Sequence, residues 1–116
     1  MRHRTFESCR YRMIKYIETD EQLKDEVAKL LPGDLVLLTA PKWCMPCRQL
    51  APHIKALGDD VDILYIDIDN LSTYGYYWPD VRSVPTLLEW GGNTYRDIKS
   101  RTFVSIKREL DANLIR

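Results

Sequence analysis

The chain is organised around the stretch Lys42-Trp43-Cys44-Met45-Pro46-Cys47-Arg48, in which two cysteines lie three positions apart. The apolar run from Leu35 to Ala40 precedes this stretch, and a helix-like segment follows it from Arg48 to Leu57. The start of a helix has unpaired N–H groups and the positive end of the helix dipole, and both favour a thiolate over a thiol. Two cysteines at this spacing can close one small disulfide. The stretch therefore predicts a redox-active dithiol at the start of a helix.

The composition is that of one soluble domain with a modest core. The chain has 116 residues, of which 45% are hydrophobic and 29% are charged, and its formal net charge is zero. We therefore expect no overall electrostatic attraction to nucleic acid or to a membrane surface. No apolar run approaches the ~20 residues that a membrane-spanning helix needs. Three cysteines cannot build a disulfide framework and no secretory signal is visible, so we expect the cytoplasm as location.

The first twelve residues differ from the rest of the chain. They hold four arginines against one glutamate and show no hydrophobic period. We expect residues 1–12 to be an N-terminal extension, for which disorder is an option, and residues 13–116 to form the domain. Two explanations of the extension stay open, an upstream start codon and a functional basic arm.

Hydrophobic periodicity predicts an alternation of strands and helices. Helices alternating with strands imply parallel pairing, and the hairpin signal Gly91-Gly92-Asn93 adds antiparallel strands near the end. We therefore predict an α/β fold with a central mixed five-stranded sheet, flanked on both faces by about four helices. The predicted strands are Ile14–Ile17, Leu35–Ala40, Val61–Asp69, Val84–Trp90 and Thr94–Ile98; the predicted helices follow Thr19 or Asp20, the cysteines and Thr102, with a short helix or turn at Asn70–Thr73.

Several motifs in this order resemble the thioredoxin family. The cysteine stretch Trp43–Cys47 follows a buried strand, and Ala51-Pro52 lies in the helix after it. Val84-Pro85-Thr86-Leu87 lies about 40 residues further on, and the tail Leu110–Leu114 also fits the family pattern. The resemblance covers about Met13 to the end and implies the thioredoxin fold.

The resemblance implies a role for each residue of the site. Cys44 matches the exposed nucleophile, and Cys47 matches the buried resolving cysteine. Trp43 matches the tryptophan beside the pair, and Pro85 matches the cis-proline that faces the disulfide. That proline leaves the backbone of Val84 free to pair with an extended substrate peptide. Met45 and Pro46, between the cysteines, are expected to contact the substrate. Met45 can also change the stiffness of the loop, and Pro46 is expected to favour a reducing potential.

The resemblance also implies the reaction and its partners. We expect a protein-disulfide reductase that works by dithiol exchange at Cys44 and Cys47, without a metal and without a cofactor other than the redox-active disulfide. A thioredoxin reductase or an equivalent donor would supply electrons, and the clients would be enzymes such as ribonucleotide reductase or peroxiredoxins. We expect a monomer that binds neither nucleic acid nor membrane. A cellular and a phage-encoded origin both stay open.

Three positions depart from the family pattern. Met45 stands where the family usually has glycine. Leu38 aligns with a buried aspartate that assists proton transfer at the resolving cysteine, and Tyr65 aligns with its lysine partner. Both members of a buried ion pair are thus expected to be replaced, a change that can leave stability intact. The proton of Cys47 would then leave by another route, for which we expect water.

Three alternatives to a protein-disulfide reductase stay open, and the role of one aromatic run is open as well. The cysteines could supply half of a zinc site, with Cys9, His3 and His53 as the remaining candidates. A glutaredoxin-like reductase fed by glutathione is a second alternative. The third is a binding subunit that uses the scaffold without redox chemistry, for example a polymerase accessory subunit. Finally, the aromatic run Tyr74–Trp78 is interpreted either as a partner-docking loop or as a loop packed on its own sheet.

Overall fold

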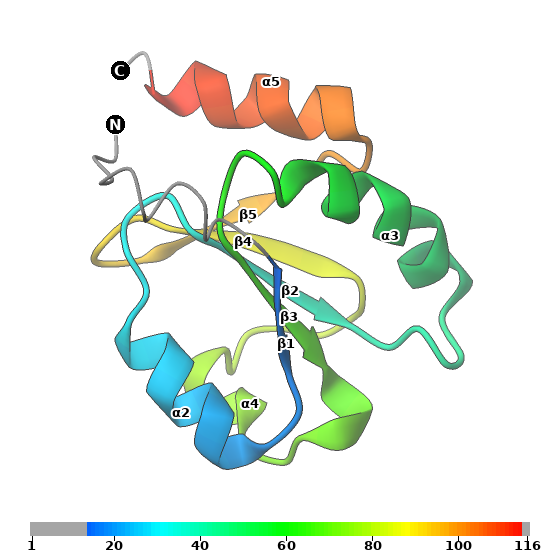
Figure 1. Cartoon of the computed structure of the whole chain (residues 1–116), viewed down its shortest axis with the longest axis vertical. Helices are drawn as coiled ribbons and strands as arrows, with labels where there is room; N and C mark the ends of the chain where they lie inside the picture. Colours follow the sequence, from blue (N-terminus) through cyan, green and yellow to red (C-terminus); the bar gives the residue numbers. More distant parts are fainter. Residues whose placement is uncertain (1–13, 115–116) are drawn as a thin grey trace.

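The computed structural model describes the backbone of residues 14–114 and the side chains of residues 14–112 (Figure 1). The extension predicted for residues 1–12 lies outside the described residues and stays a prediction. The described part alternates strands with helices in the order that the sequence predicts. Its strands are β1 (Ile14–Ile17), β2 (Leu35–Thr39), β3 (Ile63–Asp67), β4 (Thr86–Trp90) and β5 (Tyr95–Ile98); its helices are α2 (Asp20–Ala28), α3 (Met45–Leu57), the short 3-10 helix η1 (Ile68–Asn70), α4 (Tyr74–Tyr77) and α5 (Phe103–Leu114).

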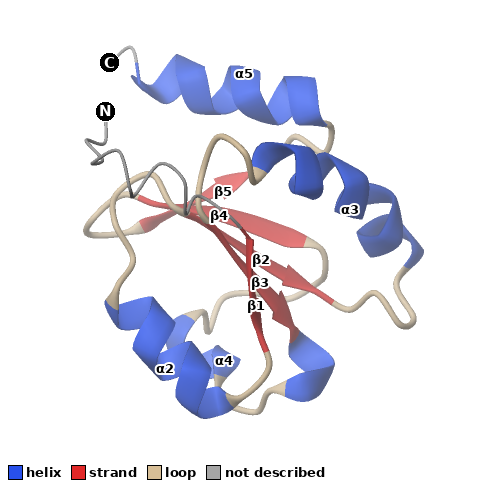
Figure 2. Ribbon diagram, viewed as in Figure 1, coloured by secondary structure: helices blue, strands red, loops and turns tan. Residues whose placement is uncertain are grey.

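The five strands form one mixed sheet in the order β1-β3-β2-β4-β5 (Figure 2). β3 pairs in parallel with both β1 and β2, whereas β4 is antiparallel to β2 and to β5. The prediction of an α/β fold with a mixed five-stranded sheet is confirmed. The turn at Gly91–Asn93 also lies where it was predicted, and Gly92 has the positive φ of 99° that such a turn requires.

Two apolar cores lie on opposite faces of the sheet, because successive side chains of a strand point to opposite sides. All five residues of β2 are buried, so this strand contributes to both cores. Figure 1 shows α3 and α5 on one side of the sheet and α2 and α4 on the other. The first core is formed by Leu35, Leu37, Leu50, Ile54, Leu57, Ile63, Leu87, Ile98, Ile106 and Leu110; the second is formed by Ile17, Leu23, Val36, Leu38, Leu64, Ile66, Leu71, Trp78 and Leu88.

Most of the predicted strands are shorter in the structure, and hydrogen bonds explain where β3 and α2 end. β3 ends at Asp67 instead of Asp69 because the Asp67 carboxylate accepts the N–H of Asp69 at 3.0 Å and caps η1. α2 ends at Ala28, although the helical spacing of apolar residues continues to Leu31. Beyond Ala28, the N–H of Leu30 bonds the Val27 carbonyl at 3.2 Å, a tighter turn than the α-helix allows.

His53 connects α3 to α5. Its Nδ1 accepts the N–H of Phe103, the first residue of α5, at 2.9 Å. Thr102 caps the same helix by accepting the N–H of Ser105 at 3.2 Å. The ring of His53 is half-buried, and it accepts one of the N–H groups at the start of α5 that have no partner within the helix.

Asp20, at the start of α2, anchors the segment before α4. Its carboxylate accepts the N–H groups of Ser72 and Thr73, both at 3.0 Å, and their hydroxyls at 2.8 and 2.7 Å. These hydrogen bonds, above all those from the Thr73 and Ser72 side chains, lower the pKa of Asp20 to about 2 from 3.8. The ionised carboxylate therefore holds together two segments that are 52 residues apart in sequence.

Replacing Asp20 by Asn is expected to lower the melting temperature at pH 7, because the amide accepts these hydrogen bonds less strongly than the carboxylate. Since the pKa of Asp20 is depressed in the folded state, its stabilising effect is complete above about pH 4 and is lost as the pH falls through about 2. Thermal unfolding of both proteins between pH 7 and pH 2 measures this. Asp25→Asn, on the same helix, is the control; an Asp20→Asn deficit that stays constant down to pH 2 would contradict the assignment.

Candidate active site

Cys44 is the N-cap residue of α3, and its extended backbone (φ −104°, ψ 107°) leads from the loop after β2 into the helix. Its Sγ accepts the N–H of Cys47 at 3.3 Å. The two cysteines form a disulfide, and their Cα atoms are 5.2 Å apart. Pro46 lies in the first turn of α3, where a missing N–H leaves no hydrogen bond unmade. The N–H of Cys47, in this first turn, therefore points to the sulfur of Cys44.

The two sulfurs have different neighbours. Cys44 is 6% exposed and Cys47 is 3% exposed, so the expectation that Cys44 is the exposed cysteine does not hold for the disulfide form. With Ala40, the two cysteines form a buried cluster against which Ile68 and Val84 pack. The Sγ of Cys44 lies 3.7 Å from the carbonyl oxygen of Val84, in the segment before β4. The Sγ of Cys47 instead accepts the N–H of Ala40 at 3.5 Å, just after the end of β2.

The segment that faces Cys44 contains the peptide bond between Val84 and Pro85, which is cis. Two hydrogen bonds that do not involve the cysteine loop hold this segment in place. The hydroxyl of Thr86 donates to the Ser83 carbonyl at 2.6 Å, and the guanidinium of Arg101 donates to the Pro85 carbonyl at 3.2 Å. The carbonyl of Val84 thus lies at a fixed place beside the disulfide.

Trp43 precedes the pair and is 61% exposed. Its indole N–H donates to the carboxylate of Asp69, in η1, at 2.9 Å. This hydrogen bond orients the ring although most of its surface is in solvent. Asp67 and Asp69 lie at the end of a predicted strand, a position that predicts strand-end and cap roles for both carboxylates. Asp67 has a cap role, but the contact of Asp69 with Trp43 was missed because the two residues are 26 positions apart.

Arg48 braces the loop before the cysteines. Its guanidinium donates to the carbonyls of Pro41 at 2.7 Å and Lys42 at 3.2 Å, which joins this loop to the first turn of α3. Met45, the first residue of α3, is exposed and its sulfur lies 4.0 Å from the same guanidinium. The residue that replaces the usual glycine therefore adds an apolar side chain to the surface around the disulfide.

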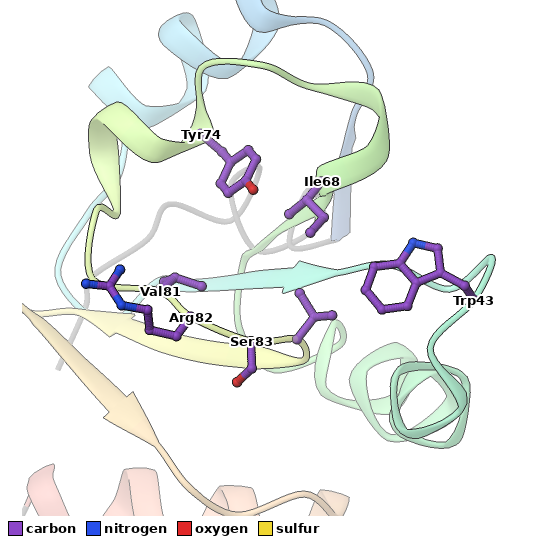
Figure 3. A pocket seen from close by; sticks show the side chains of 7 residues that line it. Trp43, Ile68, Tyr74, Val81, Arg82 and Ser83 are labelled. Carbon is purple, nitrogen blue, oxygen red and sulfur yellow. The ribbon is translucent and has the colours of Figure 1, made fainter.

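A groove of about 140 Å³ opens beside the cysteines (Figure 3). Figure 3 shows Trp43 at one end of the labelled side chains and Arg82 at the other. Two of the predicted site residues, Trp43 and Val84, line the groove. The other lining residues are Ile68, Tyr74, Val81, Arg82 and Ser83, of which the sequence indicated only Tyr74, as part of the aromatic run Tyr74–Trp78.

The aromatic run Tyr74–Trp78 divides between core and surface. Trp78 is 4% exposed and packs in the core beside α2, with its ring centroid 5.9 Å from that of Tyr95. Tyr76 is 84% exposed, and Tyr74 lines the groove. Neither interpretation therefore describes the whole run, because Trp78 packs in the core whereas Tyr76 is exposed.

Leu38 and Tyr65 do not stand in for a contacting ion pair. Leu38 is fully buried in the core beside α2, whereas Tyr65 packs against the core beside α3 and α5, on the opposite face of the sheet. Tyr65 stacks on Tyr16 with ring centroids 4.8 Å apart, and burial raises the pKa of its phenol. The expectation that these two residues replace the two members of one buried pair is wrong for this chain. Leu38 of β2 lies opposite Ile66 of β3, and Tyr65, one residue earlier on β3, points to the other face of the sheet.

Within residues 14–114, no group of three His, Cys, Asp or Glu side chains is placed to hold a metal ion. His3 and Cys9, two of the candidates for a zinc site, lie outside the described residues. The third, His53, uses its Nδ1 to cap α5. No helix in the described part of the chain is long and apolar enough to cross a membrane.

Comparison with known proteins agrees with this geometry. The family model described as Thioredoxin matches residues 15–112. A thioredoxin from Rickettsia bellii is 32% identical over 91 residues, which are 70% of this chain and 79% of that protein. The TPR repeat-containing thioredoxin TDX of rice is 39% identical over 72 residues, 60% of this chain but 22% of that protein. The crystal structure of Schistosoma mansoni thioredoxin superposes with a TM-score of 0.71 at 18% identity, covering 86% of this chain and 94% of that chain.

A disulfide-bonded Cys-x-x-Cys pair at the start of a helix, on this sheet, defines a thiol–disulfide oxidoreductase. With the family match over residues 15–112, the chain belongs to the thioredoxin family. Its cysteine pair is Cys44 and Cys47.

Because Leu38 is fully buried, an aspartate at this position, as in the family pattern, is expected to destabilise this chain. Replacing Leu38 by Asp is expected to destabilise the protein by about 4 kcal/mol at pH 7, because the charge would be buried without a partner. Burial raises the pKa of the introduced carboxyl, so the deficit shrinks as the pH falls and the group becomes neutral. Urea unfolding measures both effects.

Leu38→Asn is the matched control for this substitution, because it places a neutral group of similar shape at the same position. Its cost should not change with pH. Equal stability of the Asp and Asn variants at pH 7 would show that the site accepts a charge.

Proposed function

We propose that the chain is a protein-disulfide reductase in which Cys44 attacks the client and Cys47 resolves the intermediate. The observation that carries this assignment is the difference between the two sulfurs. The Sγ of Cys44 lies beside the carbonyl of Val84, a residue that lines the groove. The Sγ of Cys47 instead accepts a hydrogen bond from the buried N–H of Ala40. A client that enters the groove meets Cys44 first.

The proposed reaction moves two electrons from the reduced protein to the client. The thiolate of Cys44 attacks one sulfur of the client disulfide; that S–S bond breaks, and the departing client thiolate takes a proton. The thiolate of Cys47, having lost its proton, then attacks the Sγ of Cys44 in the mixed disulfide. The second client thiolate leaves and is protonated, and the Cys44–Cys47 disulfide remains.

The groove residues bind the client in this proposal. The carbonyl and N–H of Val84, beside Pro85, pair with an extended client segment in the manner of an added strand. Trp43, fixed by Asp69, and the exposed Met45 supply apolar contact area around the disulfide. Pro46 keeps the first turn of α3 in place and favours a reducing potential.

Proton transfer at Cys47 proceeds without a buried carboxylate at position 38. Leu38 is fully buried and apolar, and Tyr65 points to the other face of the sheet. We propose that water accepts the proton of Cys47. The identity of the proton acceptor affects the rate at which Cys47 resolves the mixed disulfide, but it does not change the type of reaction.

The partners proposed for this reaction are those that the resemblance to the thioredoxin family implies. A thioredoxin reductase or an equivalent donor returns two electrons to the disulfide, and clients are proteins with catalytic disulfides, such as ribonucleotide reductase. The protein works as a monomer in the cytoplasm, with no cofactor besides its own disulfide and no metal, nucleic acid or membrane partner. The family match supports a reductase and disulfide clients in general terms.

Substitution of each cysteine tests the assignment of roles. Cys44→Ser is expected to abolish reduction of insulin disulfides by dithiothreitol, because the attacking thiolate is lost. Cys47→Ser is expected to accumulate a mixed disulfide with the client, because nothing resolves it. Insulin turbidity and intact-mass measurement follow the two outcomes.

Cys9→Ser is the matched control, because it removes a thiol outside the pair and should retain full activity. Full activity of Cys44→Ser would show that the nucleophile is misassigned. Turnover with glutathione instead of thioredoxin reductase would favour the glutaredoxin-like alternative. Retention of function in Cys44→Ser/Cys47→Ser would favour the binding subunit.

A further inference from the structure

We propose that the groove beside Cys44 selects client segments that carry an acidic side chain, and that Arg82 recognises this charge. The proposal rests on the reductase function proposed above and adds a substrate class to it. It is carried by the position of an unpaired guanidinium in the wall of the groove, next to the segment that faces the reactive sulfur.

Arg82 has no carboxylate partner among residues 14–114. Its Nη1 donates to the carbonyl of Pro79 at 2.9 Å, and no ion pair joins it to any described Asp or Glu. Arg96, by contrast, pairs with Glu89 and with Glu109. The hydrogen bond to Pro79 holds the Arg82 side chain in one direction and leaves its charge and most of its N–H groups available.

The neighbouring carboxylates do not neutralise this charge. Asp69 directs its Oδ2 to the indole N–H of Trp43, at the other end of the groove. Asp80 lies two residues before Arg82 but forms no ion pair with it in the described structure. The Arg82 end of the groove therefore presents a cation.

The distance along the chain places Arg82 within reach of a bound client. Arg82 precedes Val84 by two residues, and the Val84 carbonyl is 3.7 Å from the Sγ of Cys44. Two residues of chain span at most about 7 Å, so the backbone of Arg82 lies no further than this from that of Val84. A client segment that runs alongside this loop with its cysteine at Cys44 therefore brings a residue two positions away to Arg82.

The walls at this end suit an acidic side chain with an aliphatic stem. Figure 3 shows Tyr74 projecting from α4, above Val81 and Arg82. Apolar walls exclude water and strengthen a charge-assisted hydrogen bond, and a guanidinium matches the two oxygens of a carboxylate. Tyr74 adds a hydroxyl that can donate to the same group. The chemistry thus fits a client glutamate or aspartate.

Three peptides with one disulfide test the selectivity. They differ only at the residues two positions to each side of the reacting cysteine, which are Glu, Gln or Lys. For the reduced protein, kcat/KM is expected to be about fivefold higher for the Glu peptide than for the Gln peptide, and lowest for the Lys peptide, as expected of a partly exposed ion pair. The preference should weaken at 0.5 M salt, at which exposed charges are screened.

Variants of Arg82 assign the preference to this residue. Arg82→Gln should bring the Glu/Gln ratio close to one, chiefly through KM, and Arg82→Glu should reverse the order so that the Lys peptide reacts faster than the Glu peptide. Arg108→Gln is the matched control and should keep the wild-type Glu/Gln ratio. Arg108 is exposed on α5, the helix that covers the other face of the sheet. A wild-type ratio near one, or an unchanged ratio in Arg82→Gln, overturns the proposal.

The two proposals fail in different ways. If the wild-type protein reduces none of the peptides, the reductase function itself is wrong. If it reduces all three with equal kcat/KM, the reductase function stands and the selection of acidic clients is wrong.

Discussion

The cap that Cys44 provides to α3 is the interaction on which the rest of the site depends. The hydrogen bond from the N–H of Cys47 to the Sγ of Cys44, at 3.3 Å, exists because one sulfur occupies the N-cap and the other lies one turn later. The same geometry closes the disulfide and offers the positive end of the helix to a thiolate. Burial of β2 on both faces fixes where the loop before α3 emerges, and Arg48 joins that loop to the helix.

Around this cap, helices on both faces of the sheet support the site, and the groove beside Cys44 is available for binding. α3 and α5 cover one face of the sheet, and His53 ties the start of α5 to α3. α2 and α4 cover the other face, and Asp20 ties the segment before α4 to the start of α2. The groove lies where η1, α4 and the loop before β4 meet Trp43. Elements from both faces of the sheet, each held by a side-chain hydrogen bond to a distant segment, thus surround the segment that faces Cys44.

Most of the fold and the cysteine pair could be predicted from the sequence because their signals are local. The unbroken apolar run at Leu35–Thr39, the Cys-x-x-Cys spacing and the Gly91–Asn93 turn each specify their structure within a few residues. The remaining features depend on contacts between distant segments. Asp20, His53 and Asp69 act on partners 26 to 53 residues away. The opposite orientation of Leu38 and Tyr65 depends on the register between β2 and β3, which no local pattern shows.

The central claim is that the start of α3 makes Cys44 the reactive thiolate. Alkylation of the reduced protein by iodoacetamide, followed from pH 5 to 10 with peptide mapping, tests it most directly. The account predicts that Cys44 is modified before Cys47, with a midpoint below the value of about 8.5 for a free cysteine. Modification of Cys47 first, or a Cys44 midpoint at or above that value, would contradict the account.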